Sequence, residues 1–155
     1  MIQATTWQCK PFAELTLSEL YDVLKLRTEV FIIEQNCIYQ DCDGKDEASW
    51  HLMGMVNGTL CAYARLLPPG LSYDTPSIGR VVTSPQYRNK GKGKELIEVA
   101  IKKIFDLFGH PAITISAQVY LEQFYTSFNF QSTGPIYLED NIEHIKMKRS
   151  IIPTA

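Results

Sequence analysis

The segment "YRNKGKGKELIEVAIKKIF", residues 87–105, places a basic turn directly before a stretch with helical periodicity. Its glycines, Gly91 and Gly93, carry no Cβ atom, so backbone N–H groups beside them can approach an anion closely. The first N–H groups of a helix have no partner within the helix, and the helix dipole adds about half a positive charge there. The segment therefore predicts an anion site at the start of a helix, suited to a pyrophosphate without a metal. The alternative is a basic turn whose glycines only permit its shape.

Two other phosphate loops do not fit this turn. A Walker loop requires G-x-x-x-x-G-K-[ST], but here the glycines stand two residues apart and Glu95 follows Lys94. A dinucleotide-binding loop requires G-x-G-x-x-G after the first strand of the fold, and residues 91–96 lack the third glycine. The pattern that remains is R-x-x-G-x-G between a strand and a helix.

The segments on either side of the turn complete a strand–helix–strand unit. Apolar residues recur at helical spacing from Leu96 to Phe108, and Gly109 with Pro111 ends the predicted helix. Residues 77–83 and 112–117 are the predicted strands. Strands joined in this way are expected to be parallel, with a right-handed crossover.

Further local signals predict the other elements. Thr16 and Glu19 form a capping box, so a helix should run from residue 17 into the low thirties. Asn57-Gly58 is typical of a type I′ turn and predicts a hairpin. The remaining predicted elements are a first strand over 5–12, a short helix over 119–128 and two strands around the acidic turn 139–141. We expect one mixed α/β domain over residues 1–155, with a central, partly parallel sheet flanked by helices.

Composition and charge exclude several classes of function. The chain of 155 residues is 45% hydrophobic and 21% charged, as in a globular domain, and its net charge of −2 gives no general attraction to nucleic acid. No run approaches the roughly 20 apolar residues of a membrane span. Residues 1–10 do not resemble a secretory signal. We therefore expect a cytoplasmic protein with no nucleic-acid or membrane partner. The four cysteines form no C-x-x-C pair, so we also expect no metal site.

The basic turn belongs to a longer pattern that resembles a known family. Residues 81–96, "VVTSPQYRNKGKGKEL", resemble motif A of the GNAT acyltransferase superfamily, and residues 124–130, "FYTSFNF", resemble its motif B. Asn129 stands where motif B usually has glycine, but asparagine tolerates a left-handed backbone better than most residues. Four further segments resemble the ElaA-like N-acetyltransferase subgroup, and the match covers nearly the whole chain: residues 20–35, 78–82, 116–125 and 139–147.

The resemblance implies a GNAT-like fold and acetyl-CoA as cosubstrate, without a metal. Backbone groups of Val81, Val82 and Thr83 would pair with the pantetheine arm. Gln118 stands where the family often has an asparagine that touches this arm, and Tyr125 matches the tyrosine beside the thioester sulfur. The turn would hold the phosphates with Arg88, Asn89, Lys90, Gly91, Lys92 and Gly93.

Amide formation from an amine and a thioester needs an acid for the departing sulfur and a base for the amine. The phenol of Tyr125, with a reference pKa near 10, suits the acid, although a core tyrosine is the alternative. His51, on a predicted strand, titrates near neutral pH and is the first candidate for the base. Its alternative is a hydrogen-bonded histidine of the hairpin. Glu34, His144 and backbone groups between parted strands are further candidates.

Two predicted loops that could flank the entrance for the acceptor are rich in acidic residues: Asp41, Asp43, Asp46, Glu47, Glu139 and Asp140. They either attract a cationic amine or, as we favour, form an ordinary solvated surface. We expect acetyl transfer to a primary amine on a small molecule or a peptide. A polyamine, an amino sugar, a peptide N-terminus and a lysine all fit. A CoA-binding module without transferase activity is the alternative function, and a homodimer is left open.

Overall fold

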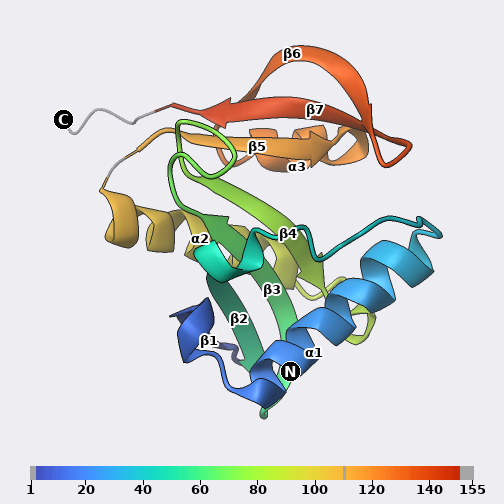
Figure 1. Ribbon diagram of the computed structural model, residues 1–155, viewed down its shortest axis with the longest axis vertical. Helices are drawn as coiled ribbons and strands as arrows, with labels where there is room; N and C mark the ends of the chain where they lie inside the picture. Colours follow the sequence, from blue (N-terminus) through green and yellow to red (C-terminus); the bar gives the residue numbers. More distant parts are fainter. Residues whose placement is uncertain (1–2, 110, 151–155) are drawn as a thin grey trace.

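The computed structural model describes residues 3–109 and 111–150 and shows two sheets, the first with helices on both faces (Figure 1). The helices and strands follow one another as β1 (Thr6–Pro11), α1 (Leu17–Arg27), β2 (Trp50–Val56), β3 (Thr59–Leu67), β4 (Ser77–Thr83), α2 (Lys92–Phe108), β5 (Ile113–Gln118), α3 (Glu122–Thr126), β6 (Phe130–Glu139) and β7 (Ile142–Arg149). A π-helical segment, Thr28–Glu34, continues α1. Single 3₁₀ turns occupy Phe12–Glu14, Asp46–Ala48, Pro85–Tyr87 and Val119–Leu121. The predicted mixed α/β content is confirmed, while the predicted domain over 1–155 extends beyond the described residues.

Every ladder among the described residues is antiparallel. The first sheet has the strand order β1-β2-β3-β4 and the second β5-β7-β6. Asn57 and Gly58, with φ of 50° and 78°, have the positive φ at both positions that a type I′ turn requires. Asp140 and Asn141 between β6 and β7 also have positive φ, 53° and 63°. Both predicted hairpins are confirmed.

The predicted parallel pairing of residues 77–83 with residues 112–117 is wrong. β4 pairs with β3 and β5 pairs with β7, and no ladder joins β4 to β5 in the described part of the chain. A backbone hydrogen bond of 3.1 Å from Thr114 N–H to the Pro76 carbonyl links the beginnings of the two strands. Farther along, a cavity lined by both strands occupies the space that a ladder would need. An irregularity of β4 at Arg80 also interrupts regular pairing.

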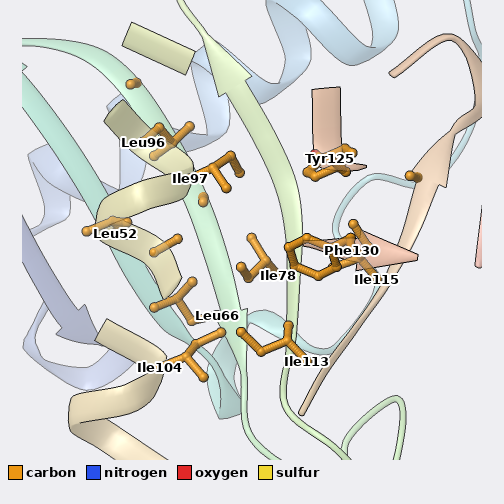
Figure 2. Packing of buried hydrophobic residues seen from close by; sticks show 14 of the residues in the cluster. Leu52, Leu66, Ile78, Leu96, Ile97, Ile104, Ile113, Ile115, Tyr125 and Phe130 are labelled. Atoms are coloured by element: carbon orange, nitrogen blue, oxygen red, sulfur yellow. The ribbon is translucent and has the colours of Figure 1, made fainter. Parts of the chain in front are cut away.

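The two long helices cover opposite faces of the first sheet, because successive strand residues point to alternate faces. Met53 and Tyr63 pack with Val23 and Leu26 of α1. Leu52 and its neighbours pack on the other face against α2, and this larger cluster continues to the second sheet and α3. Figure 2 shows the central members of this cluster: Leu52, Leu66, Ile78, Leu96, Ile97, Ile104, Ile113, Ile115, Tyr125 and Phe130. One core therefore positions α2, β4, β5 and α3 together.

The ends of the helices follow the local signals in the sequence. Thr16 Oγ1 accepts from Glu19 N–H at 3.0 Å and Glu19 Oε1 accepts from Thr16 N–H at 2.9 Å, so the predicted capping box is confirmed. α1 and its π-helical continuation reach Glu34, as predicted. α2 ends at Gly109, which has a φ of 82°. No helix within residues 3–109 and 111–150 is long and apolar enough to span a membrane.

Candidate functional site

A cavity of about 600 Å³ lies between the diverging strands β4 and β5. Residues 78–81 of β4 form one wall and residues 115–118 of β5 the other. Tyr125 of α3 and His144 of β7 also line it, as do Glu139 and Asp140 of the β6–β7 hairpin. This volume is in the range of small-molecule binding sites. The divergence of the two strands therefore creates a cavity large enough for a small molecule.

β4 is irregular where it borders this cavity. Arg80 has a φ of 51°, and the ladder with β3 shifts between Tyr63 and Arg65. A left-handed conformation of a residue other than glycine costs on the order of 1–3 kcal/mol and requires support from its surroundings. Arg80 Nε donates to Asp41 Oδ1 at 2.8 Å, Nη2 donates to the Asp41 carbonyl at 3.0 Å, and the guanidinium lies 5.7 Å from the Tyr39 ring centroid. These contacts hold the irregular segment in place.

The acidic loop is part of an ion-pair network with the first sheet and α1. Three aspartates of the loop pair with three arginines, one each on α1, β3 and β4. The network consists of Asp41, Asp43 and Asp46 with Arg27, Arg65 and Arg80. Arg27 is fully buried, and its Nε and Nη1 each lie 2.8 Å from a carboxylate oxygen, of Asp41 and Asp46 respectively. The preferred prediction of a solvated loop is wrong for Asp41 and Asp46, whose side chains are 8% and 13% exposed, whereas Asp43 stays at the surface although it pairs with Arg65. Because their charges are matched by arginines, they attach the loop to the first sheet. Glu47 is exposed.

The basic turn between β4 and α2 contains two residues in the left-handed region. Asn89 has a φ of 61° and Gly91, the N-cap of α2, a φ of 75°. Glu95 N–H donates to the Gly91 carbonyl at 3.1 Å, so the N–H groups of residues 92–94 precede the hydrogen bonds of the helix. A Cβ atom at Gly91 would meet nothing within 4 Å. The turn thus presents donors at a place with room for an anion.

Lys92, one of the predicted phosphate-binding residues, directs its side chain into the protein. The residue is 3% exposed, and Nζ donates to the Gln3 carbonyl at 2.8 Å and to Thr5 Oγ1 at 2.6 Å. Lys92 therefore ties the start of α2 to the segment before β1. Only the backbone N–H of Lys92, and not its side chain, can then serve as an anion donor of the turn.

Arg88 and Lys90 remain at the surface of the turn. The Arg88 guanidinium donates to both carboxylate oxygens of Glu34, at 2.7 and 3.0 Å, and the two side chains are 39% and 44% exposed. Lys90 Nζ lies 5.5 Å from the ring centroid of Tyr87. Glu34, a further candidate for the base, is therefore engaged at the turn and is not part of the cavity wall.

Tyr125 combines burial in the core with access to the cavity. It is 6% exposed, and its ring meets those of Phe124 and Phe130 edge-on at centroid distances of 5.2 and 5.9 Å. Burial raises the pKa of its phenol, and the nearby Tyr120 adds to the effect. Its hydroxyl has no hydrogen-bond partner within the described residues. This phenol stays protonated at neutral pH and is available to donate.

His51 lies away from the cavity, at the centre of the first sheet. It is 1% exposed and burial lowers its pKa. Nε2 lies 2.9 Å from the Asp46 carbonyl, which can only accept, so Nε2 carries the proton. Nδ1 then accepts from the Tyr63 hydroxyl at 2.8 Å. Both nitrogens are occupied, and the geometry favours the structural alternative for this residue.

His144 lines the cavity and is 7% exposed. Its Nδ1 lies 2.7 Å from the Ile142 carbonyl, and its Nε2 lies 3.4 Å from Glu139 Oε2. Its ring stacks on that of Tyr137, with centroids 6.2 Å apart. Of the two histidines considered as bases, His144 is therefore the one that lines the same cavity as Tyr125.

The remaining predicted residues divide between the cavity and its surroundings. Val81 and Gln118 line the β4 and β5 walls of the cavity that Tyr125 also lines. Val82 is 4% exposed and packs in the cluster under α1, so its side chain faces away from the cavity. Thr83 ends β4, where it pairs with Ala62 of β3. The cavity thus brings together Val81, Gln118 and Tyr125, while Val82 and Thr83 lie outside its lining and the basic turn follows the end of β4.

The sequence interpretation missed the arginine residues that shape β4. Arg27 lies at the end of α1, and its local sequence does not indicate that the side chain is fully buried. The three aspartates within residues 41–46 were a usable signal, because such density needs compensating cations when the loop packs against the fold. Among the described residues, no three His, Cys, Asp or Glu side chains form a cluster that could hold a metal ion.

Comparisons with known proteins identify related chains that match this one over most of their length. A model of the acetyltransferase (GNAT) domain matches residues 21–151. Protein ElaA of Escherichia coli (strain K12) is 38% identical over 148 residues, which cover 94% of this chain and 97% of ElaA. The crystal structure of an acyl-CoA N-acyltransferase from Pseudomonas aeruginosa is 43% identical, with a TM-score of 0.90, and the match covers 95% of this chain and 100% of that one. An aminoglycoside 6′-N-acetyltransferase complexed with coenzyme A shares the fold, with a TM-score of 0.71 at 13% identity over 96% of this chain and 99% of that one.

Proposed function

This chain belongs to the GNAT acetyltransferase family, and we propose that it transfers an acetyl group from acetyl-CoA to a primary amine by direct attack of the amine on the thioester. The family supports acyltransferase activity, and the relation to ElaA covers most of the chain. The acetyl donor and the amine acceptor are what the proposal adds.

The observation that carries the proposal is the path from the cavity to the basic turn. The β4 wall of the cavity includes Val81, the strand ends at Thr83, and the turn with its free N–H groups follows. At about 3.3 Å per residue, residues 81–83 span roughly 10 Å between the cavity wall and the turn. An elongated ligand with an anionic end and a reactive end fits this arrangement.

Acetyl-CoA has this chemistry, and the residues present suit it. Because β4 has no ladder on the side of β5 within the described residues, its backbone groups can pair with the amides of a pantetheine arm, as in strand addition. The N–H groups at residues 92–94 and the dipole of α2 suit the pyrophosphate. Arg88 can join them, since an exposed ion pair such as Arg88–Glu34 contributes only about 0–1 kcal/mol.

Tyr125 is proposed as the acid of the reaction. Acetyl-CoA supplies the activated acyl carbon, to which the amine nitrogen bonds as the C–S bond breaks. Tyr125 donates its phenol proton to the departing sulfur, and its raised pKa keeps that proton in place until charge develops there. The burial of the phenol also keeps water away from the donor.

The proposal is tested by thiol release from acetyl-CoA with four amines: spermidine, kanamycin, tri-alanine and Nα-acetyl-lysine. We expect at least one amine to raise the rate well above the amine-free rate, with mass spectrometry showing the acetylated product. A raised melting temperature with acetyl-CoA but no amine-dependent release would instead favour the alternative, a CoA-binding module. If acetyl-CoA neither raises the melting temperature nor releases thiol with any of the amines, the proposal is refuted.

A further inference from the structure

His144 has a position that its sequence context does not reveal. β7 is the middle strand of the second sheet, and His144 pairs in register with Gln118 of β5 and Tyr137 of β6. The ring is 7% exposed and stacks on Tyr137 at an interplanar angle of 23°. Packing therefore fixes the direction in which the imidazole faces the cavity.

The hydrogen bond at Nδ1 determines which nitrogen can act as a base. Nδ1 lies 2.7 Å from the Ile142 carbonyl. A carbonyl oxygen only accepts, so Nδ1 must carry a proton. In the neutral ring the free lone pair is then on Nε2. His51 has no such lone pair, because its unprotonated nitrogen already accepts from the Tyr63 hydroxyl.

Glu139 lies where it can hold a cation beside this lone pair. Its Oε2 is 3.4 Å from Nε2, and its side chain is 49% exposed and lines the cavity. The Nε2 lone pair and the Glu139 carboxylate both accept hydrogen bonds, so a donor must lie between them. That donor is either a proton on Nε2 or a ligand that directs one N–H group to each acceptor. An ammonium ion has three such N–H groups.

We propose that His144 is the general base of the reaction and that Glu139 binds the acceptor as an ammonium ion beside it. The inference rests on the acetyl transfer proposed above. It places base and acid, His144 and Tyr125, on the walls of one cavity. The inference also specifies the acceptor as a cationic primary amine whose ammonium group can reach the Glu139 carboxylate.

The protons balance as follows. The ammonium nitrogen has three protons and the amide product retains one, so two must leave. Nε2 of His144 takes the first and passes it to solvent after turnover. Tyr125 gives its proton to the sulfur as the C–S bond breaks, and the second proton of the nitrogen restores the phenol. No oxidant, metal or further reactant is needed.

Other titratable or charged groups line the cavity or belong to the elements packed against β7: Cys37, Tyr39, Asp43, Lys45, Arg65, Tyr73, Arg80, Tyr120, Tyr125, Tyr137, Asp140 and Lys146. Arg65 and Arg80 are paired with aspartates of the network. Lys146 Nζ lies 5.4 Å from the Tyr73 ring centroid. In the described residues, Glu139 is the carboxylate that contacts Nε2.

The test is the pH dependence of kcat/KM for the fastest of the four amines, in the wild type, His144→Gln and Glu139→Gln. A base that must be neutral gives the wild type an acid limb, along which the rate rises with pH. His144→Gln should lose this limb and lower kcat by about 10²-fold or more. Glu139→Gln should raise the KM for the amine several-fold, because the bound ammonium ion loses its carboxylate partner.

Glu143→Gln is the matched control, since Glu143 is exposed on the same strand and one residue away. It should leave the limb and the KM unchanged. A His144→Gln variant with wild-type kcat and acid limb would overturn this inference alone, while a wild type inactive with all four amines would overturn the proposed function as well. If His144→Gln does not fold, Glu139→Gln decides, because the half-exposed side chain of Glu139 can be replaced without loss of packing. An unchanged KM for the amine in that variant would overturn the inference.

Discussion

Replacing Tyr125 by phenylalanine separates the chemistry of this residue from its packing. The substitution keeps the ring, and with it the edge-on contacts to Phe124 and Phe130. The lost hydroxyl has no hydrogen-bond partner within the described residues, so no buried group is stranded. The free energy of unfolding should therefore change by about 1 kcal/mol or less. For a chain of this length this corresponds to a change in melting temperature of about 2–4 °C at most.

The kinetic effect should be far larger than the stability effect. A general acid contributes about 10²–10⁴-fold, so kcat should fall by roughly 10²-fold or more, which is about 2.7 kcal/mol of transition-state stabilisation. The KM for acetyl-CoA should change little, because the phenol acts on charge that develops only as the thiolate leaves. Steady-state thiol release and thermal melts on both proteins measure the two effects separately. A Tyr125→Phe variant that melts early but retains its activity per folded molecule would show that Tyr125 is a core residue and that another group is the acid.

Four further outcomes are expected. Gly91→Val should abolish the rise in melting temperature caused by acetyl-CoA, whereas Gly109→Val, also at positive φ but at the other end of α2, should retain it. His51→Gln should lower the melting temperature without lowering kcat per folded molecule; a specific loss of kcat would restore His51 as a candidate base. Burial alone would raise the pKa of Asp43 and Asp46, but their arginine partners outweigh burial and lower the pKa of both. The stability that the two carboxylates contribute should therefore be present above about pH 4 and be lost as the pH falls below that value. Thermal melts in acid that show no such loss would contradict the network. Turnover should survive EDTA, because protons and phosphates are handled by protein groups; activity lost with EDTA and restored by zinc would contradict this.

Much of the fold could be predicted because the deciding signals are local. The capping box at Thr16 and Glu19 and the Asn57-Gly58 turn depend on neighbouring residues, and the structure contains both. The basic turn and the apolar spacing after it likewise predicted α2. A sequence reader can find such elements without knowing what they pack against.

The relation of β4 to β5 could not be predicted in this way. A strand–helix–strand unit normally gives parallel neighbours. Here the left-handed Arg80, supported by Asp41 from a distant loop, disturbs β4. Nothing in the sequence around Arg80 indicates that support, because it comes from residues 39 positions away.

The ranking of the histidines shows the same limit. His51 and His144 both lie on predicted strands, and both were considered as bases. The partners of the ring nitrogens distinguish the two: Tyr63 and the Asp46 carbonyl for His51, and the Ile142 carbonyl and the Glu139 carboxylate for His144. Sequence spacing cannot supply this information, since it is set by tertiary packing.

The central claim is that coenzyme A binds along β4 with its phosphates at the start of α2, and a crystal structure with coenzyme A tests it most directly. We expect the pyrophosphate within hydrogen-bond distance of the N–H groups of residues 92–94, the pantetheine arm between β4 and β5, and the thiol directed toward Tyr125. Coenzyme A bound elsewhere on the protein, with β4 unpaired and the turn unchanged, would contradict the account.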